Sequence, residues 1–138
     1  MLHQTHVDNF RTKYHENFYA IFRIAIGLLF MEHGAQKLFG IWGMTQPVKI
    51  VSMFGLAGII EFFCGLLIVL GLFTVPAVII TSLEMLYAFF TVHLPKSPVP
   101  LVSGGELALL YLAAFLYIFF NGPGKWSLDR KWCKDCKK

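Results

Sequence analysis

The chain has 138 residues, of which 57% are hydrophobic and 14% are charged, and its formal net charge is +4 at pH 7. Soluble domains are nearer ~45–50% apolar, so this composition indicates a membrane protein, and the length fits a single domain over residues 1–138. The basic residues form no run interleaved with aromatic side chains, which excludes the usual design of a single-stranded nucleic-acid site.

Four apolar segments follow a polar N-terminal stretch, and each is near the ~20 residues that an α-helix needs to cross a bilayer. No segment alternates apolar and polar residues with a period of two, so strands are not expected. The sequence therefore predicts an all-α membrane protein built as a four-transmembrane-helix bundle. The expected spans lie at about residues 17–39, 54–73, 75–93 and 105–121, and a hydrophilic tail follows at 122–138.

Basic residues predict the orientation of this bundle, because positive charge concentrates on the cytoplasmic side of a membrane. Three lysines lie in or near the connections on one side of the expected bundle: Lys37, Lys49 and Lys96. Eight basic residues lie toward the two chain ends on the other side: Arg11, Lys13, Lys125, Arg130, Lys131, Lys134, Lys137 and Lys138. We therefore expect a multi-pass protein of the cell membrane whose N and C termini are both cytoplasmic.

Each expected span carries one glutamate: Glu32, Glu61, Glu84 and Glu106. An ionised carboxylate at the centre of a bilayer is disfavoured by ~2.5–3.5 kcal/mol even on the lenient insertion scale. A bundle with one such group per helix must neutralise them, pair them or line a wet cavity with them. The interior of the bundle is therefore where a functional site is expected, in the outer half of the membrane.

Helical periodicity predicts which face of each span turns inward. Small residues beside a polar one are typical of close helix contacts in lipid, so we expect Glu61 and Glu84 to face inward and Glu32 to lie opposite Arg23. The expected stripes are Arg23, Gly27, Phe30, Gly34 and Lys37 in the first span; Gly58, Glu61 and Gly65 in the second; Ala77, Thr81, Glu84, Ala88 and Thr91 in the third; and Glu106, Ala113 and Tyr117 in the fourth.

Glu61, Glu84 and His33 are the candidate catalytic residues. Intramembrane ionisable groups mark proton relays and ligand sites, so the two glutamates are candidates for a proton-relay or ligand-polarising pair. The alternative is that they are protonated or paired groups that only fix the register of the helices. His33 either donates a hydrogen bond to a ligand oxygen or satisfies a backbone carbonyl.

The candidate substrate-binding residues are Arg23, Lys37, His93, Lys96 and Glu106. Each has a structural alternative. We expect Arg23 to pair with a carboxylate and Lys37 to extend toward the outer headgroups. His93 and Lys96 either anchor the third span at the interface or form the rim of a cavity. In Ser103-Gly104-Gly105-Glu106 the carboxylate of Glu106 is expected to form a capping box at the start of the fourth span.

A di-iron site is not expected, because it needs Glu-x-x-His and neither Glu61 nor Glu84 has a histidine three residues later. Cys133 and Cys136 form a Cys-x-x-Cys motif in the tail, where redox exchange or metal capture are weak alternatives to a solvated dithiol. Cys64 is expected to be a small buried apolar residue.

Motifs along the chain are similar to those of the DoxX family. They are Arg23-x-x-x-Gly27 with His33-Gly34-x-x-Lys37-x-x-Gly40; Glu61-x-x-x-Gly65 with Gly71-Leu72-Phe73-Thr74; His93-Leu94-Pro95-Lys96; Gly104-Gly105-Glu106; and Gly122-Pro123-Gly124-Lys125-Trp126-Ser127-Leu128-Asp129. The resemblance covers about residues 22–129. It implies a four-helix integral membrane protein whose relatives include a subunit of thiosulfate:quinone oxidoreductase, proteins proposed for oxidative-stress complexes, and proteins linked to quinone and catechol handling.

The function that this resemblance and the charged spans predict is a redox-linked membrane subunit that handles a quinone or a small sulfur or phenolic compound. A quinone is the candidate cofactor, and electrons would come from it, from a soluble or membrane redox partner, or from the tail dithiol. One alternative is a non-enzymatic carrier or receptor for a small anionic or lipid-like ligand. Another is an assembly partner of a second membrane protein, and a homo-oligomer is open in every case.

Overall fold

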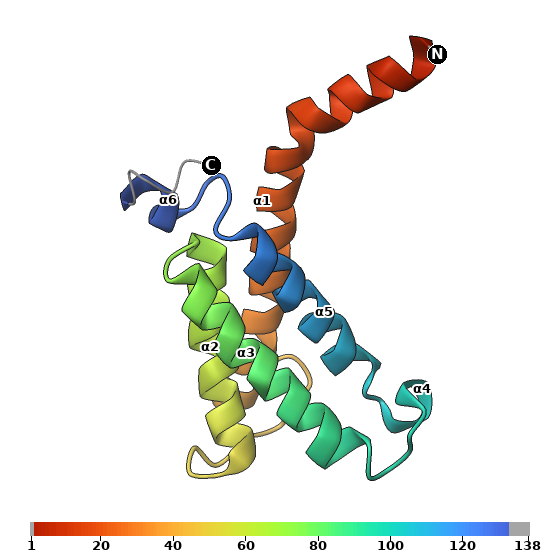
Figure 1. Cartoon of the computed structure of the whole chain (residues 1–138). Helices are drawn as coiled ribbons and strands as arrows, with labels where there is room; N and C mark the ends of the chain where they lie inside the picture. The colour runs from red at the N-terminus through yellow and green to blue at the C-terminus, as the bar shows by residue number, and fades with distance from the viewer. Residues whose placement is uncertain (1, 133–138) are drawn as a thin grey trace.

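The computed structural model describes residues 2–132, with side chains from residue 11 onward, and every regular element in this part of the chain is a helix (Figure 1). The elements are α1 (Leu2–Phe39), α2 (Met53–Leu70), α3 (Thr74–Ala88), the π-helix η1 (Phe89–His93), α4 (Pro100–Ser103), α5 (Glu106–Asn121) and α6 (Leu128–Trp132). Within the described residues, three helices are long and apolar enough to cross a membrane, and α5 is a shorter apolar helix. The prediction of an all-α membrane fold is therefore confirmed.

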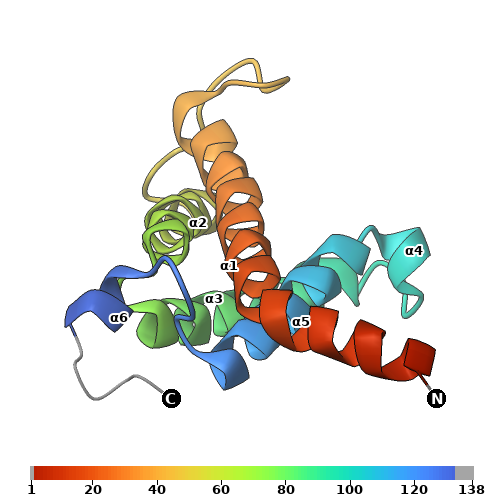
Figure 2. The same ribbon diagram turned by 90° about the horizontal axis from the view of Figure 1, so that it is seen from above.

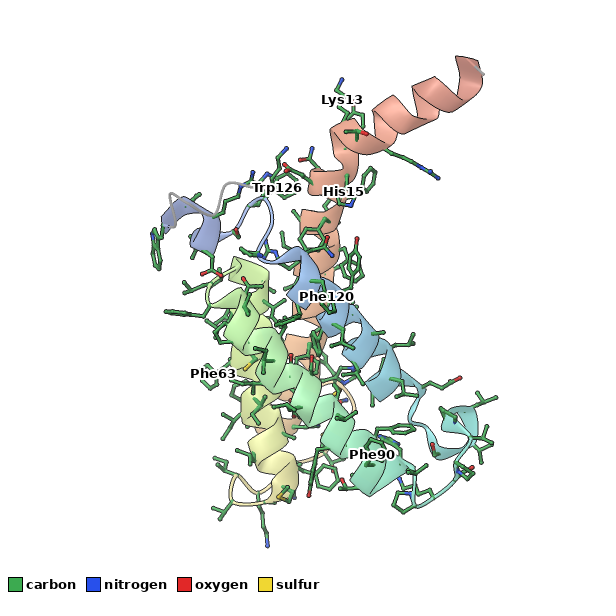
Figure 3. All side chains as sticks on the ribbon, in the orientation of Figure 1. Lys13, His15, Phe63, Phe90, Phe120 and Trp126 are labelled. Carbon is green, nitrogen blue, oxygen red and sulfur yellow. The ribbon has the colours of Figure 1, made fainter. Side chains whose placement is uncertain are left out.

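The helices pack as two pairs that lie against each other. α1 lies along α2, α5 lies along α3, and α2 joins the pairs through α3. The start of α1 and the short α6 lie at one end of the bundle, whereas the loop before α2 and the connection through α4 lie at the other end (Figures 1 and 2). The outer surface is apolar: Phe63, Phe90 and Phe120, labelled in Figure 3, are 57%, 55% and 81% exposed.

α1 begins earlier than the expected span, at Leu2 rather than near Asn17. No glycine or proline precedes Gly27 in the sequence, so nothing there interrupts a helix once it has formed. The segment before Lys13 turns away from the bundle, as Figures 1 and 3 show. The third span also differs from a simple helix, because its last turn is the π-helix η1.

Glycines allow α1 and α2 to approach each other closely. A Cβ atom added to Gly27 would lie 2.9 Å from the backbone nitrogen of Val69, and one added to Gly65 would lie 2.7 Å from that of Met31. A Cβ atom on Gly34 would overlap the backbone of Phe62. The predicted stripes of small residues on the first two spans are thus confirmed as a helix contact.

The inward face of α5 differs from the predicted one. Glu106, Ala113 and Tyr117 are all exposed. The buried face is aromatic and aliphatic instead: Ala108, Tyr111, Ala114, Phe115 and Ile118. The prediction was wrong because it placed the inward face by the polar Glu106 and the small Ala113. In the structure, Phe30 of α1 packs against large rings of α5. Its ring centroid lies 5.1 Å from that of Tyr111 and 4.8 Å from that of Phe115.

Arg23 holds the end of the bundle where α6 lies. Its guanidinium is fully buried, and it donates hydrogen bonds to the carbonyl oxygens of Ile68 and Val69 at the end of α2, at 2.9 Å for Val69. It also donates to the carbonyl oxygens of Lys125 and Trp126, at 3.2 and 3.1 Å. The expectation that Arg23 pairs with a carboxylate was therefore wrong: unpaired helix-end carbonyls are its partners.

Asp129 closes the same end of the bundle. Its two carboxylate oxygens accept hydrogen bonds from the backbone nitrogens of Phe73 and Thr74, both at 2.8 Å, at the start of α3. Phe73 has a φ of 47°, a left-handed conformation that a bulky residue adopts only when its surroundings hold it there. A carboxylate at a helix N-terminus supplies that restraint, because it satisfies free N–H groups and complements the helix dipole.

We expect Arg23→Lys to lower the free energy of unfolding by at least about 2 kcal/mol, because an ammonium cannot span two pairs of carbonyls as the guanidinium fork does. Thermal unfolding of the purified protein in mild detergent measures the effect. Arg11→Lys is the matched control, since Arg11 is exposed on the same helix. An unchanged melting temperature for Arg23→Lys would contradict the role given to this side chain.

Gly34→Ala is expected to destabilise the bundle by roughly 1–3 kcal/mol, because the added methyl overlaps α2 and forces α1 away from it. Detergent-resistant folding and the melting temperature report the loss. Ala25→Leu, on the exposed face of α1, adds more volume where nothing packs and should leave both unchanged. Equal melting temperatures for the two variants would show that the close contact is not needed.

Candidate functional site

A cavity of about 250 Å³ opens at the end of the bundle opposite α6, among α1, α2, α3, η1 and α5. Apolar residues such as Phe30, Phe54 and Met85 form much of its wall. Seven of its lining residues have polar groups on their side chains: His33, Lys37, Glu61, Glu84, Tyr87, His93 and Tyr111. The structure therefore brings together all three candidate catalytic residues and two of the five candidate substrate-binding residues.

Lys37 and Glu61 form an ion pair in the wall of this cavity. The Nζ atom of Lys37 donates to Oε1 of Glu61 at 2.6 Å, and Glu61 is only 4% exposed. The other carboxylate oxygen of Glu61, Oε2, is buried and has no hydrogen-bond partner among the described residues. Lys37 does not extend to the headgroups as expected, because the close contact of α1 and α2 places a buried carboxylate within its reach.

Glu84 projects into the cavity from α3. Both of its carboxylate oxygens are buried, and neither has a hydrogen-bond partner in the described part of the chain. Buried polar groups in native proteins are nearly always hydrogen-bonded, so an unpaired one needs an explanation such as a ligand or a catalytic role. The inward orientation predicted for Glu61 and Glu84 is confirmed.

His33 lies against Tyr111, with the two rings edge to face and their centroids 5.7 Å apart. Tyr111 is 6% exposed and belongs to the buried face of α5, so it meets His33 from across the bundle. The sequence interpretation missed Tyr111 because it followed the charged residue of the span. Its spacing from Ala108, Phe115 and Ile118 at three, four and seven residues was the signal that could have identified it.

His93 ends the π-helix η1 and lines the cavity. Its Nδ1 atom lies 3.1 Å from the carbonyl oxygen of Ser103. A carbonyl can only accept, so Nδ1 carries the hydrogen, and in the neutral ring Nε2 is then a free acceptor. π-Helical turns within α-helices often occur at functional sites, and this one sets the position of His93 at the cavity.

The other candidate residues lie outside the cavity. Arg23 is at the opposite end of the bundle, and Lys96 is exposed in the connection after η1. Glu106 is exposed at the start of α5, where Gly105 is the N-cap and makes no side-chain hydrogen bond. The capping box was therefore wrong: the Ser103 hydroxyl donates to the carbonyl of Pro100 instead, at 3.3 Å.

Neither a metal site nor the cysteine pair contributes to the described site. Cys133 and Cys136 lie outside the described residues. Within residues 11–132, whose side chains the structure describes, no group of three or more His, Cys, Asp or Glu side chains is placed to hold a metal ion. Cys64 is buried at 8% exposure, as its position in an apolar span predicted.

The polar groups of the cavity can bind oxygen atoms and exchange protons within an apolar enclosure. Lys37 offers donor hydrogens, the two glutamates offer carboxylate oxygens, and the histidines offer both donor and acceptor nitrogens. The Lys37–Glu61 pair leaves one carboxylate in the cavity without a counter-charge. This combination suits a small polar aromatic ligand better than an apolar one.

Comparisons with known proteins agree with this architecture. Residues 18–94 match the DoxX family. An uncharacterized protein of Haemophilus influenzae is 38% identical over 133 residues, which covers 88% of this chain and 96% of that relative. An uncharacterized membrane protein of Mycobacterium tuberculosis is 28% identical over 133 residues, with 81% and 79% of the two chains covered. No solved structure gives a significant match.

The coupling between Lys37 and Glu61 can be measured with a double-mutant cycle. We expect Lys37→Met alone to lower the free energy of unfolding by roughly 2–3 kcal/mol, because it leaves Glu61 buried without a counter-charge; full burial would cost ~3–5 kcal/mol. The double variant Lys37→Met/Glu61→Leu should recover most of the loss. Thermal unfolding in detergent measures each corner, and strictly additive effects would show that the pair does not interact.

Proposed function

Because this chain belongs to the DoxX family of membrane proteins, we propose that it is a redox-linked membrane subunit that handles a quinone or a small sulfur or phenolic compound in the cavity described above. One observation carries the proposal. Five polar side chains predicted as site residues converge on one cavity from different helices, and two of them are carboxylates with unpaired buried oxygens. Unpaired buried polar groups and ionisable groups inside a membrane bundle are functional candidates by default.

The residues of the cavity divide into two roles under this proposal. Lys37 and His93 contact oxygen atoms of the ligand, while Glu61, Glu84 and His33 hold and move protons. Interconversion of quinone and hydroquinone moves protons together with electrons, so a site for it needs such groups beside the ring. The electrons come from a soluble or membrane redox partner. Arg23, Lys96 and Glu106 have no contact with the ligand in this proposal, because they lie outside the cavity.

The size of the cavity favours a small ligand. Its volume of about 250 Å³ is just below the ~300 Å³ at which pockets for drug-sized molecules begin. One substituted ring fits such a space, and a longer apolar tail would have to leave it. Phe54 and Tyr87 line the cavity and are 58% and 54% exposed, so the wall reaches the outer surface of the helices, where a tail can enter the lipid.

We also propose that α5 is the fourth membrane span, that both chain ends are cytoplasmic and that residues 1–138 form one domain. α5 is apolar over 16 residues and packs along α3, which supports a place inside the bundle. The start of α1 and α6 lie at one end of the bundle, as an even number of spans requires (Figure 1). The excess of basic residues at that end supports a cytoplasmic side.

We expect Glu61→Gln to abolish retention of the ligand while the bundle stays folded, because glutamine keeps the size and an acceptor for Lys37 but loses the charge. The measurement is the absorbance spectrum of protein purified in mild detergent, together with mass spectrometry of the small molecules that co-purify. Glu32→Gln is the matched control, since Glu32 is exposed on α1 and does not line the cavity.

The compound that co-purifies separates the candidate functions. A quinone or phenolic compound that is lost in Glu61→Gln and kept in Glu32→Gln supports the redox-linked subunit. An unrelated lipid or anion lost in the same way would replace it with a non-enzymatic carrier or receptor. A protein that retains no small molecule, and whose charged variants change only the membrane proteins that co-purify, would instead be an assembly partner.

A further inference from the structure

The buried polar atoms of the cavity that lack a hydrogen-bond partner in the described part of the chain are all carboxylate oxygens, which accept hydrogen bonds. Three buried side-chain oxygens among its lining residues have no partner in the described part of the chain: Oε2 of Glu61 and both carboxylate oxygens of Glu84. They belong to two residues, one on α2 and one on α3, that line the same cavity. A ligand that fills this space must therefore supply hydrogen-bond donors, or these oxygens stay desolvated and unpaired.

His93 adds a further acceptor. Its Nδ1–H is taken by the carbonyl oxygen of Ser103 at 3.1 Å, so the neutral ring has only the lone pair of Nε2 to offer the cavity. The Nζ atom of Lys37, the strongest donor of the cavity, already donates one hydrogen bond to Oε1 of Glu61 at 2.6 Å. The cavity also has donors, which are the hydroxyls of Tyr87 and Tyr111, the ring of His33 and the remaining hydrogens of Lys37. None of them pairs with the three buried carboxylate oxygens.

Buried oxygens lack donors in both protonation states of Glu84. If Glu84 is ionised, the cavity holds two carboxylates against one ammonium, and both of its oxygens need donors. If Glu84 is protonated, its O–H becomes a donor. Its carbonyl oxygen and Oε2 of Glu61 then still lack donors, and Glu61 and Lys37 balance in charge. Anionic ligands are repelled in the first case and gain no net attraction in the second.

We propose that this cavity binds the hydroxyl-bearing, reduced form of an aromatic ligand, a hydroquinone or phenol, in preference to the matching quinone and to inorganic anions. This inference rests on the proposed function and specifies its ligand. The two hydroxyl groups of a hydroquinone donate to the carboxylates of Glu61 and Glu84, while Lys37 or His33 donates to a hydroxyl oxygen. The carbonyl oxygens of a quinone only accept, so they leave the carboxylates unpaired.

The walls of the cavity suit the ring of such a ligand. Phe30 and Tyr111 lie on one side, with their ring centroids 5.1 Å apart, and Phe54 and Tyr87 line other parts of the wall. Aromatic rings contact one another favourably in edge-to-face and offset arrangements. A flat six-membered ring therefore gains apolar contact on its faces while its substituents meet the polar groups.

The test compares matched ligands on the full chain in mild detergent. Isothermal titration under anaerobic conditions measures the affinities of durohydroquinone, duroquinone, thiosulfate and benzylammonium. We expect durohydroquinone to bind at least about tenfold more tightly than duroquinone, because sites built around a hydroxyl group strongly reject the analogue that lacks it. Thiosulfate should bind more weakly than either.

Glu84→Gln is expected to remove most of the preference for durohydroquinone, because the amide replaces one acceptor with a donor of the same size. Glu84→Asp keeps a carboxylate and should retain the preference, which guards against a loss caused by misfolding. Glu106→Gln is the matched control, since this glutamate is exposed and outside the cavity. A full preference in Glu84→Gln would overturn the role assigned to Glu84.

Each other outcome has a distinct meaning. Equal affinities, or tighter binding of duroquinone, would overturn this inference and leave the proposed function standing. Tighter binding of benzylammonium would overturn it in favour of a cationic ligand, and tighter binding of thiosulfate in favour of an anionic one. Failure of both duroquinone and durohydroquinone to bind the wild-type chain would overturn the inference together with the proposed quinone or phenolic ligand.

Discussion

The ion pair between Lys37 and Glu61 depends on how closely two membrane helices approach each other. Glycines on both helices bring the backbones of α1 and α2 together, and only at that separation does the Lys37 ammonium reach a carboxylate at 2.6 Å. A lone carboxylate on α2 would be costly in lipid, so the contact and the charge pair stabilise each other. The pair lies in the wall of the cavity, inside the bundle.

The buried charged side chains at the two ends of the bundle differ in their hydrogen-bond partners. At the end near α6, Arg23 and Asp129 are bound to backbone groups that helix ends leave free. These charges join α2, α3 and the C-terminal segment. Among the described residues, Nε of Arg23 and Oγ1 of Thr74 are the buried side-chain atoms that remain without a partner there. At the opposite end, Glu61 is half satisfied and Glu84 is not satisfied at all. Backbone groups thus satisfy most of the buried charge at the first end, whereas the second end keeps carboxylate oxygens that no described residue pairs with.

Much of this arrangement could be predicted from the sequence, because the inward faces of α1, α2 and α3 combine small residues with one polar residue at helical spacing. The partners of Arg23 could not, since they are carbonyl groups, which every residue has and no sequence pattern marks. The face of α5 was misread because Glu106 lies at the helix start, where a charged group can reach the interface and needs no inward orientation. Tyr111 was missed with it.

Retaining an unpaired Glu84 is costly to the fold, and a neutral side chain of the same size would relieve that cost. This loss of stability is confined to Glu84, because the neighbouring Thr81 and Met85 are buried in the core and make no hydrogen bond to its carboxylate. Glu84 is thus a buried polar group that lowers stability, and it lies in a cavity beside the paired Lys37 and Glu61. Such a local conflict with stability is typical of a functional site. Lys37 already donates to Glu61, and no side chain among the described residues donates to Glu84. Under the inference above, a hydroxyl group of the ligand supplies the missing donor, and the two carboxylates determine which ligands can do so.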